Sequence, residues 1–332
     1  MTVRIGTRAS KLALTQTQQT ADQLAAVGGF PVELVHIRTD GDVLTGSLSQ
    51  MGGTGVFVAA LRDALLRNEC DVAIHSLKDL PTGAAVGLSL AATPRRVDVR
   101  DVLCARDGLK LADLPAGAGV GTGSPRRAAQ LRAARPDLEI IDIRGNVDTR
   151  LGRVPGLPGN ATTEVGPGKS CDLDAVVLAA AGLERISRLD TVSEFLETDV
   201  MLPAAGQGSL AIECRTADAP ARPGFAEGSK DVLAQALSAL DDPDTRLAVT
   251  AERALLARLE AGCAAPVGAY AFRKGSLLHL EAVVCAVDGT ASVRDKRATD
   301  GLTEVGATLL GIELAEVLLA AGAADIADLQ AS

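Results

Sequence analysis

The first half of the chain alternates short apolar runs with segments whose apolar residues recur at helical spacing. Strand-like runs such as VELVHIR (32–38) and DVAIHSL (71–77) are separated by helix-like segments such as VFVAALRDALL (56–66). The same alternation returns with SPRRAAQLRAAR (124–135) as a helix and LEIIDIR (138–144) as a strand. Strands that alternate with helices indicate mostly parallel sheets covered by helices. We therefore predict two α/β units of about a hundred residues each.

The pattern changes near residue 229. Alternating apolar and polar positions over about 267–298, with Asp-Gly at 288–289 as a hairpin turn, predict an antiparallel sheet, and a final helix is expected over about 302–321. The Gly-rich segment 202–215 precedes a strand that we expect to return to the first unit. The predicted domains are residues 1–95 with about 203–228 (α/β), residues 96–202 (α/β) and residues 229–332 (α+β).

Composition narrows the class of protein. Of the 332 residues, 47% are apolar and 23% charged, the balance of an ordinary soluble globular protein. Aromatic residues make up only 2%, and the formal net charge is -9. Base-stacking surfaces are therefore scarce and phosphate backbones are repelled. We expect no nucleic-acid partner.

The N-terminus and the cysteines indicate a cytoplasmic protein. The first twenty residues lack the basic start and apolar run of a signal peptide, and no run of 18 apolar residues predicts a membrane span. Six cysteines are scattered without CxxC or Cys/His spacing, at positions 70, 104, 171, 214, 263 and 285. We therefore predict no disulfide framework, no metal and no membrane association.

The segment GTGSPRR predicts an anion site. Ser124 suits the N-cap of a helix and Pro125 its first position. Arg126 and Arg127 then lie in the first turn, where the helix dipole disfavours cations. Free backbone N–H groups and two guanidinium groups together favour an anion. The alternative is that both side chains point into solvent.

More cationic and hydroxyl side chains follow the predicted strands. Ligands of open α/β sheets lie beyond the carboxyl ends of the strands. Any one of these residues is as easily a surface charge, but together they predict a polyanion that carries carboxylates or phosphates. The residues at or just beyond these ends are Arg8, Ser10, Ser76, Lys78, Asp79, Arg144 and Arg150.

Asp79 and Cys263 are the candidates for chemistry. Asp79 is either an ion-pair partner of Lys78 or an arginine, which spacing alone slightly favours, or a group that stabilises a cation or transfers a proton. Cys263 follows Gly262 in a loop after a helix, and its local sequence indicates only an exposed thiol. His75 lies in an apolar strand and reads as a core residue, so no catalytic triad is evident.

In combination, these segments resemble the porphobilinogen deaminase family along nearly the whole chain. The resemblance implies two α/β domains with the fold of type II periplasmic binding proteins and a C-terminal α+β domain that carries the cysteine. It also implies a monomer. The segments that carry the resemblance are RIGTRASKLAL, FVAALRDALL, DVAIHSLKDLPT, GTGSPRRAAQL, IRGNVDTRL, VVLAAAGLERI, LPAAGQGSLAIECR and TAERALLARLEAGCAAPVGAYA.

The resemblance further implies a transferase of porphyrin (haem) biosynthesis, a hydroxymethylbilane synthase. It would condense four porphobilinogen molecules into the linear tetrapyrrole hydroxymethylbilane with release of ammonia, on a dipyrromethane cofactor joined to Cys263 by a thioether. By similarity, Asp79 contacts the pyrrole nitrogens and stabilises positive charge. The implied cofactor- and substrate-binding residues are Arg8, Ser10, Ser76, Lys78, Thr122, Ser124, Arg126, Arg127, Arg144, Gly145, Arg150, Arg185 and Gln207.

The chain departs from the family pattern in the segment that the resemblance identifies as a lid. Many relatives have a lysine before GLF or SLF, where this chain has Thr54, while Phe57 keeps the aromatic. The Gly- and Pro-rich stretches 154–170 and 217–229 are longer than the resemblance predicts. Two other classes compete: an anion-binding protein without chemistry, and a phosphate-handling transferase. Cys263 and Asp79 disfavour the first, and the lack of a P-loop Lys-Ser/Thr disfavours the second.

Overall fold

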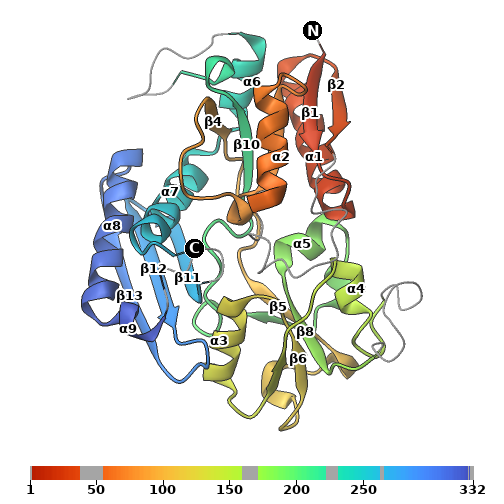
Figure 1. The fold of residues 1–332 in the computed structure, drawn as a ribbon, viewed down its shortest axis with the longest axis vertical. Coiled ribbons are helices and arrows are strands. Elements are labelled where there is room, and N and C mark those ends of the chain that lie inside the picture. Colours follow the sequence, from red (N-terminus) through yellow and green to blue (C-terminus); the bar gives the residue numbers. More distant parts are fainter. Residues whose placement is uncertain are drawn as a thin grey trace. The chain divides into compact units, whose positions relative to one another are not determined.

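In the computed structural model the chain folds into two compact units (Figure 1). Unit 1 comprises Met1–Val97 and Ser209–Thr250, and unit 2 comprises Asp98–Gly208 and Ala251–Ser332. The residues that the structure describes are 2–37, 55–158, 171–221, 231–261, 265–327 and 329. Most of the two predicted insertions lies outside them. In the described part, no helix is long and apolar enough to cross a membrane.

Unit 1 is built on a five-stranded sheet with the order β2-β1-β3-β10-β4. β1 is parallel to β2 and β3, whereas β10 is antiparallel to β3 and β4, so the segment after the Gly-rich turn returns to this sheet as expected. The strands are β1 (Val3–Thr7), β2 (Val32–His36), β3 (Val72–Ser76), β4 (Leu88–Ala92) and β10 (Leu210–Arg215).

Three helices cover the two faces of this sheet. Successive strand residues point to opposite faces, so Val72 and Ile74 pack with α1 (Lys11–Gly28) and α6 (Val232–Leu240), while Ala73 packs with α2 (Gly55–Leu66). Both faces are therefore apolar and buried. His75 of β3 and Glu213 of β10 are buried polar exceptions within the sheet.

Unit 2 contains a second five-stranded sheet, with the order β7-β6-β8-β5-β9. β6 is parallel to β7 and β8, and β5 is antiparallel to β8 and β9, so both sheets have the same arrangement. β5 and β10 are both fourth in their sheet orders. Each is the first strand after the chain crosses from one unit to the other, β5 after Val97 and β10 after Gly208. The strands are β5 (Asp101–Ala105), β6 (Gly119–Gly121), β7 (Glu139–Ile141), β8 (Ala175–Ala179) and β9 (Glu194–Leu196).

Helices again cover both faces of the second sheet. Val177 and Leu131 of α3 (Pro125–Ala134) belong to one core cluster. Val176, on the other face, packs with α4 (Val147–Leu151) and α5 (Ala180–Arg185). The predicted fold class, two similar α/β sheets with a separate C-terminal module, is confirmed. Single 3-10 turns lie at Leu77–Asp79, Arg106–Gly108, Leu111–Asp113, Leu189–Thr191 and Thr216–Asp218.

The C-terminal module is an antiparallel sheet with the order β11-β12-β13, contacted by α8. Its strands and the predicted Asp-Gly hairpin turn are as expected from the sequence. The module packs against α3, because Ala129, Leu202, Val283 and Cys285 form one buried cluster with Tyr270 against it. The three-domain division stays a prediction. The elements are α7 (Pro243–Arg258), β11 (Val267–Lys274), β12 (Leu277–Cys285), β13 (Ser292–Thr299), α8 (Glu304–Ala320) and α9 (Ala323–Ile326).

Gly289 is where the hairpin turn meets α3, and its replacement tests this packing. A Cβ there would lie 2.8 Å from Ala133 N and 2.9 Å from Ala129 O, and φ is +78°. We expect Gly289→Ala to lower the free energy of unfolding by about 3 kcal/mol, from overpacking and from the left-handed backbone. Tyr270 is the chain's one tyrosine and there is no Trp, so its fluorescence in urea reports on the packing of this sheet.

Gly275→Ala is the matched control, because its φ is +61° but nothing lies within 4 Å of the added Cβ. It should cost only about 1 kcal/mol. Equal decreases in the free energy of unfolding for the two variants would show that the hairpin turn is not closely packed against α3.

Candidate functional site

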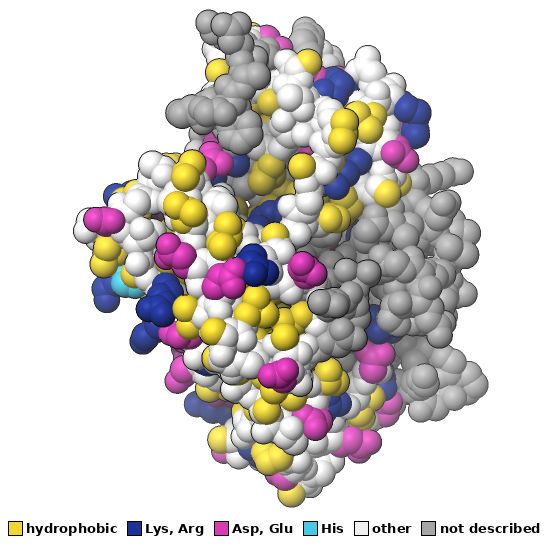
Figure 2. Space-filling model, turned by 60° about the vertical axis from the view of Figure 1, so that its left-hand side comes forward, with side chains coloured by type: hydrophobic (Ala, Val, Ile, Leu, Met, Phe, Trp, Pro, Cys, Tyr) yellow, Lys and Arg dark blue, Asp and Glu magenta, His cyan; other side chains and the backbone are white. Residues whose placement is uncertain are grey.

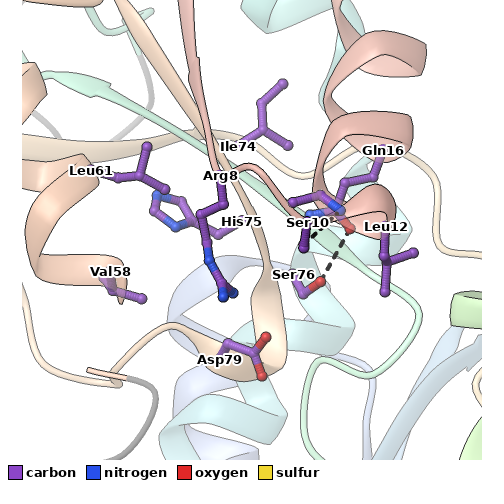
Figure 3. Close-up of a pocket in the computed structure, with 11 residues that line it drawn as sticks. Arg8, Ser10, Leu12, Gln16, Val58, Leu61, Ile74, His75, Ser76 and Asp79 are labelled. Carbon is purple, nitrogen blue, oxygen red and sulfur yellow. Dashed lines mark hydrogen bonds between the residues drawn. The ribbon is translucent and has the colours of Figure 1, made fainter. Parts of the chain in front are cut away.

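In unit 1 the ends of β1 and β3 and the start of α1 line a pocket (Figure 3). The structure thus brings together four residues predicted from the sequence: Arg8, Ser10, Ser76 and Asp79. The remaining lining residues are Leu12, Ala13, Gln16, Val58, Leu61, Ile74 and His75. Lys78 lies in the same turn, is half-buried and is not among the lining residues.

Local structure explains why these side chains converge. Ser10 is the N-cap of α1, and its Oγ accepts a hydrogen bond from Ala13 N at 3.3 Å, which fixes the turn after β1. Asp79 ends the 3-10 turn after β3, and three residues per turn bring it to the same side as Ser76. Figure 3 shows Arg8 extending from the end of β1 toward the Asp79 carboxylate. The pocket therefore offers a cation and an anion side by side.

His75, which lines this pocket, belongs to a buried polar cluster. His75 is 5% exposed, so the expectation of a core histidine is confirmed, and its Nε2 lies 3.2 Å from Glu213 Oε2. Glu213 also accepts hydrogen bonds from Arg62 Nε (3.0 Å) and NH2 (2.8 Å). Burial raises the pKa of Glu213, but the hydrogen bonds from His75 and Arg62 outweigh it and lower the pKa to about 2. Sequence reasoning missed Glu213; its one signal is an acid inside the apolar strand LAIECR.

The start of α3 in unit 2 is built as the sequence predicts. Ser124 is the N-cap, Pro125 is the first helical residue, and the Ser124 Oγ accepts from Arg127 N at 3.5 Å. Thr122 is buried, and its Oγ1 accepts from Ser124 N at 3.2 Å. Gly123 is required in this turn because a Cβ would lie 2.5 Å from Ile143 O.

Arg126 and Arg127 do not point into solvent. They are 4% and 6% exposed, and both pair with Asp101 at 2.7 Å. Gln207, another predicted ligand residue, uses its Nε2 to donate to Asp101 Oδ1 and to Val99 O, each at 2.8 Å. The alternative that the arginines are surface charges is therefore wrong. They form a buried network that contains two cations and one anion.

Arg150 and Arg185 are the predicted arginines that carry a charge without an acidic partner. Within the described part of the chain neither forms an ion pair: Arg150 Nε donates to Gly145 O (2.8 Å), and Arg185 NH2 donates to Gly208 O (3.0 Å). Burial and then the charges of Arg127 and Arg144 lower the pKa of Arg150 to about 10. Burial also lowers the pKa of Arg185. Asp142 and Glu184 offset these shifts only in part, and both arginine side chains are half-buried. A partly desolvated cation without an ion pair is costly, so this arrangement favours an anionic ligand.

The other predicted residues of unit 2 lie beside Arg150. Gly145 has φ +108°, and a Cβ there would meet Thr149 at 2.9 Å. Arg144 is 49% exposed and pairs with Asp142 at 3.3 Å. Its charge is therefore available to a ligand from solvent, whereas Arg150 offers a charge that is already partly desolvated.

The predicted cofactor-attachment and lid residues are not all among the residues that the structure describes. Cys263 and Thr54 lie outside the described residues, and Phe57 is described only as part of α2. The strand cysteines are core residues as expected: Cys104 and Cys285 are buried, and burial raises the pKa of each to about 11. They are therefore neutral thiols near pH 7 and poor nucleophiles. Among the described residues, no group of three or more His, Cys, Asp or Glu is arranged to hold a metal.

Comparisons with known proteins cover nearly the whole chain. The family described as "Porphobilinogen deaminase, dipyromethane cofactor binding domain" matches residues 3–222, and "Porphobilinogen deaminase, C-terminal domain" matches residues 246–320. A protein named porphobilinogen deaminase from Cutibacterium acnes is 54% identical over 99% of this chain and 98% of its own length. One of the same name from Thermobifida fusca is 52% identical over 97% and 95%.

Solved structures are more distant. An ABC transporter periplasmic substrate-binding protein from Coxiella burnetii covers 73% of this chain and 92% of its own, with 14% identity and a TM-score of 0.41.

The buried ion pairs in unit 1 yield a prediction about acid stability. The pKa of Glu213 is about 2 in the folded chain and about 4.3 when unfolded, so its charge contributes about 3 kcal/mol above pH 4.3, which is lost as the pH falls toward 2. We expect Glu213→Gln to be less stable by about that amount at pH 7. The difference between the two proteins in urea unfolding should shrink between pH 5 and pH 2.

Glu69→Gln is the control, because Glu69 also pairs with an arginine in unit 1 but is exposed. Its effect on the free energy of unfolding should be small at every pH, because solvent screens this exposed pair. A constant deficit for Glu213→Gln over the whole pH range would contradict the ionised state of Glu213.

Proposed function

The chain belongs to the porphobilinogen deaminase family, and from this membership we propose which of its residues carry the family's reaction. Enzymes of this family are transferases, hydroxymethylbilane synthases of tetrapyrrole biosynthesis, with a dipyrromethane cofactor. The proposed reaction joins four porphobilinogen molecules head to tail. One ammonia leaves for each molecule added, and water releases the linear hydroxymethylbilane.

Arg150 and Arg185 carry the assignment of ligand to site. Both are half-buried cations that form no ion pair among the described residues, and the mutual repulsion of Arg150, Arg127 and Arg144 is relieved by an anion. Porphobilinogen and dipyrromethane carry acetate and propionate side chains, which guanidinium groups bind in bidentate fashion. The residues of unit 2 thus fit the carboxylates of cofactor and substrate. We assign this binding to Thr122, Ser124, Arg126, Arg127, Arg144, Gly145, Arg150, Arg185 and Gln207.

Asp79 is the proposed catalytic residue. Its carboxylate lines the pocket of unit 1 with Arg8 directed toward it. When ammonia leaves porphobilinogen, positive charge develops on the pyrrole, and a fixed carboxylate stabilises that charge in a site shielded from water. Arg8, Ser10, Ser76 and Lys78 are assigned to binding substrate carboxylates around it. The alternative from the sequence, that Asp79 is only an ion-pair partner of Lys78 or an arginine, predicts a near-normal kcat for an Asp79→Asn variant.

Cys263 is the proposed attachment point of the cofactor through a thioether. When bound, dipyrromethane supplies the pyrrole carbon to which the first porphobilinogen is joined. The task of the chain's own residues is then to hold carboxylates and to exclude water. Thr54 and Phe57 are assigned to the lid.

Porphobilinogen is the proposed substrate, and the chain is proposed to act as a monomer in the cytoplasm, in the three domains expected from the sequence. A nucleic-acid partner is not part of the proposal. On the face shown in Figure 2, acidic and basic side chains of the described residues are interspersed, without an extended basic patch. The net charge of -9 points the same way.

The cofactor tether predicts the mass of the purified protein. The full chain should exceed its sequence mass by two pyrrole units and colour with Ehrlich's reagent, and Cys263→Ser should have the plain mass and make no hydroxymethylbilane. Cys171→Ser is the control, because Cys171 is the exposed thiol among the described cysteines, and it should keep the added mass. Plain mass and no bilane from the wild-type chain would refute the proposed function.

The role of Asp79 predicts a loss of turnover without loss of cofactor. Asp79→Asn keeps the shape and removes the charge, and we expect kcat to fall about 10²- to 10³-fold while the intact mass still includes the cofactor. Asp113→Asn is a matched control, since Asp113 also ends a 3-10 turn but is exposed. It should stay within about twofold of wild type. A near-normal kcat for Asp79→Asn would remove Asp79 from the mechanism.

A further inference from the structure

Asp101 is a fully buried acid at the first position of β5, and neither sequence motif nor family resemblance assigns it a role. Its exposure is 0%. Both carboxylate oxygens are engaged by side chains that the site proposal names. Oδ1 accepts from Arg127 Nε (2.9 Å) and NH2 (2.7 Å) and from Gln207 (2.8 Å), while Oδ2 accepts from Arg126 NH2 (2.7 Å).

The two guanidinium groups are also fixed at their far ends. Arg126 NH1 donates to Leu202 O at 2.6 Å, and Arg127 NH1 donates to Val177 O at 3.2 Å. Each arginine is therefore held between a carboxylate and a backbone carbonyl, which leaves little rotamer freedom. Side chains fixed in this way meet a ligand without first losing conformational entropy.

The charges of the network do not cancel. Burial raises the pKa of Asp101, but the charges of Arg126 and Arg127 outweigh it and hold the pKa well below its usual range, so the carboxylate is ionised. Two guanidinium groups and one carboxylate leave one positive charge in a buried place. Arg127 is also close enough to Arg150 to lower its pKa. The positive charge left in the network therefore lies close to that of Arg150, which forms no ion pair among the described residues.

We propose that Asp101 is the positioning residue of the anion site in unit 2. It orients Arg126 and Arg127, and it cancels one of their two charges so that both can be buried next to Arg150. This inference rests on the proposed function, because it takes substrate carboxylates as the anions. Asp101 itself has no exposed surface and acts through the arginines.

Asp101→Asn is the direct test. If the amide keeps its oxygen toward Arg127 and Gln207, its NH2 group faces the Arg126 NH2 donor. Arg126 then keeps Leu202 O as an acceptor but loses the carboxylate and its counter-charge. With the full chain, we expect KM for porphobilinogen to rise at least tenfold and kcat to change less than threefold. Loss of the cofactor mass from a folded Asp101→Asn preparation would support the proposal equally, because the cofactor bears the same carboxylates.

Asp174→Asn is the matched control. Asp174 lies in the same unit and likewise accepts from an arginine, Arg106 Nε at 2.7 Å, and from a backbone N–H, Gly119 N at 2.8 Å, but contacts no predicted site residue. It should keep KM within twofold and keep the cofactor. A structural role alone would lower the melting temperature of Asp101→Asn and leave KM unchanged well below that temperature. That outcome would overturn the proposal.

Gln207→Leu decides the case if Asp101→Asn does not fold. It removes the hydrogen bonds that Gln207 donates to Asp101 and to Val99 O, and it leaves the ion pairs of Asp101 with Arg126 and Arg127. KM should therefore rise about threefold with the fold intact. An unchanged KM would overturn the proposal. The wild-type assay separates the two hypotheses: if the wild-type chain makes no bilane, the proposed function fails. If the wild type is active and these variants keep its KM, only the role of Asp101 fails.

Discussion

The burial of positive charge in unit 2 depends on one carboxylate. Arg126 and Arg127 lie in the first turn of α3, where the helix dipole opposes them, and they are almost inaccessible to water. Desolvating two guanidinium groups costs several kcal/mol each unless an anion and hydrogen-bond acceptors replace the water. Asp101 supplies the anion, and the carbonyls of Leu202 and Val177 supply acceptors. The start of α3, and the cations near it, can therefore be buried only while β5 delivers Asp101 to this place.

The two units meet this constraint in the same way. In each unit, one antiparallel strand carries a buried acid that contacts basic side chains. β5 brings Asp101 to Arg126 and Arg127, and β10 brings Glu213 to Arg62 and His75. The outcomes differ in charge. Around the start of α3, unit 2 has two buried arginines for one carboxylate, and Arg150 and Arg185 form no ion pair among the described residues, whereas the pocket of unit 1 holds the acid Asp79 with Arg8. The two units thus differ in where their acid lies: Asp101 is enclosed by arginines, whereas Asp79 faces a pocket.

Local features of the fold could be predicted because they depend on neighbouring residues. The N-cap at Ser124 and the Asp-Gly hairpin turn follow from residues a few positions apart. The return of the Gly-rich segment to the first sheet does not, because it pairs Leu210 with Ser76. Asp101 and Glu213 could not be predicted in the same way. Asp101 pairs with Gln207 across 106 positions and Glu213 with Arg62 across 151, and only the folded sheets bring such residues together. For Cys263 no local physical signal distinguishes a tether from a loop thiol, so its assignment depends on the family resemblance.

Glu252 shows how the remaining parts of unit 2 are joined to this network. It is fully buried in α7, and its carboxylate accepts hydrogen bonds from Gly206 N at 2.6 Å and from Ala271 N of β11 at 2.7 Å. Gly206 has a φ of +74° and precedes Gln207, which donates to Asp101. Glu252 therefore connects the turn that carries Gln207 to strand β11. The arginines and the sheet of β11 lie in one compact unit, where the Glu252 carboxylate binds backbone N–H groups between them in addition to the apolar cluster beside α3. Each of these acids has its oxygens committed to groups within the unit, so neither Asp101 nor Glu252 is available to Arg150 or Arg185.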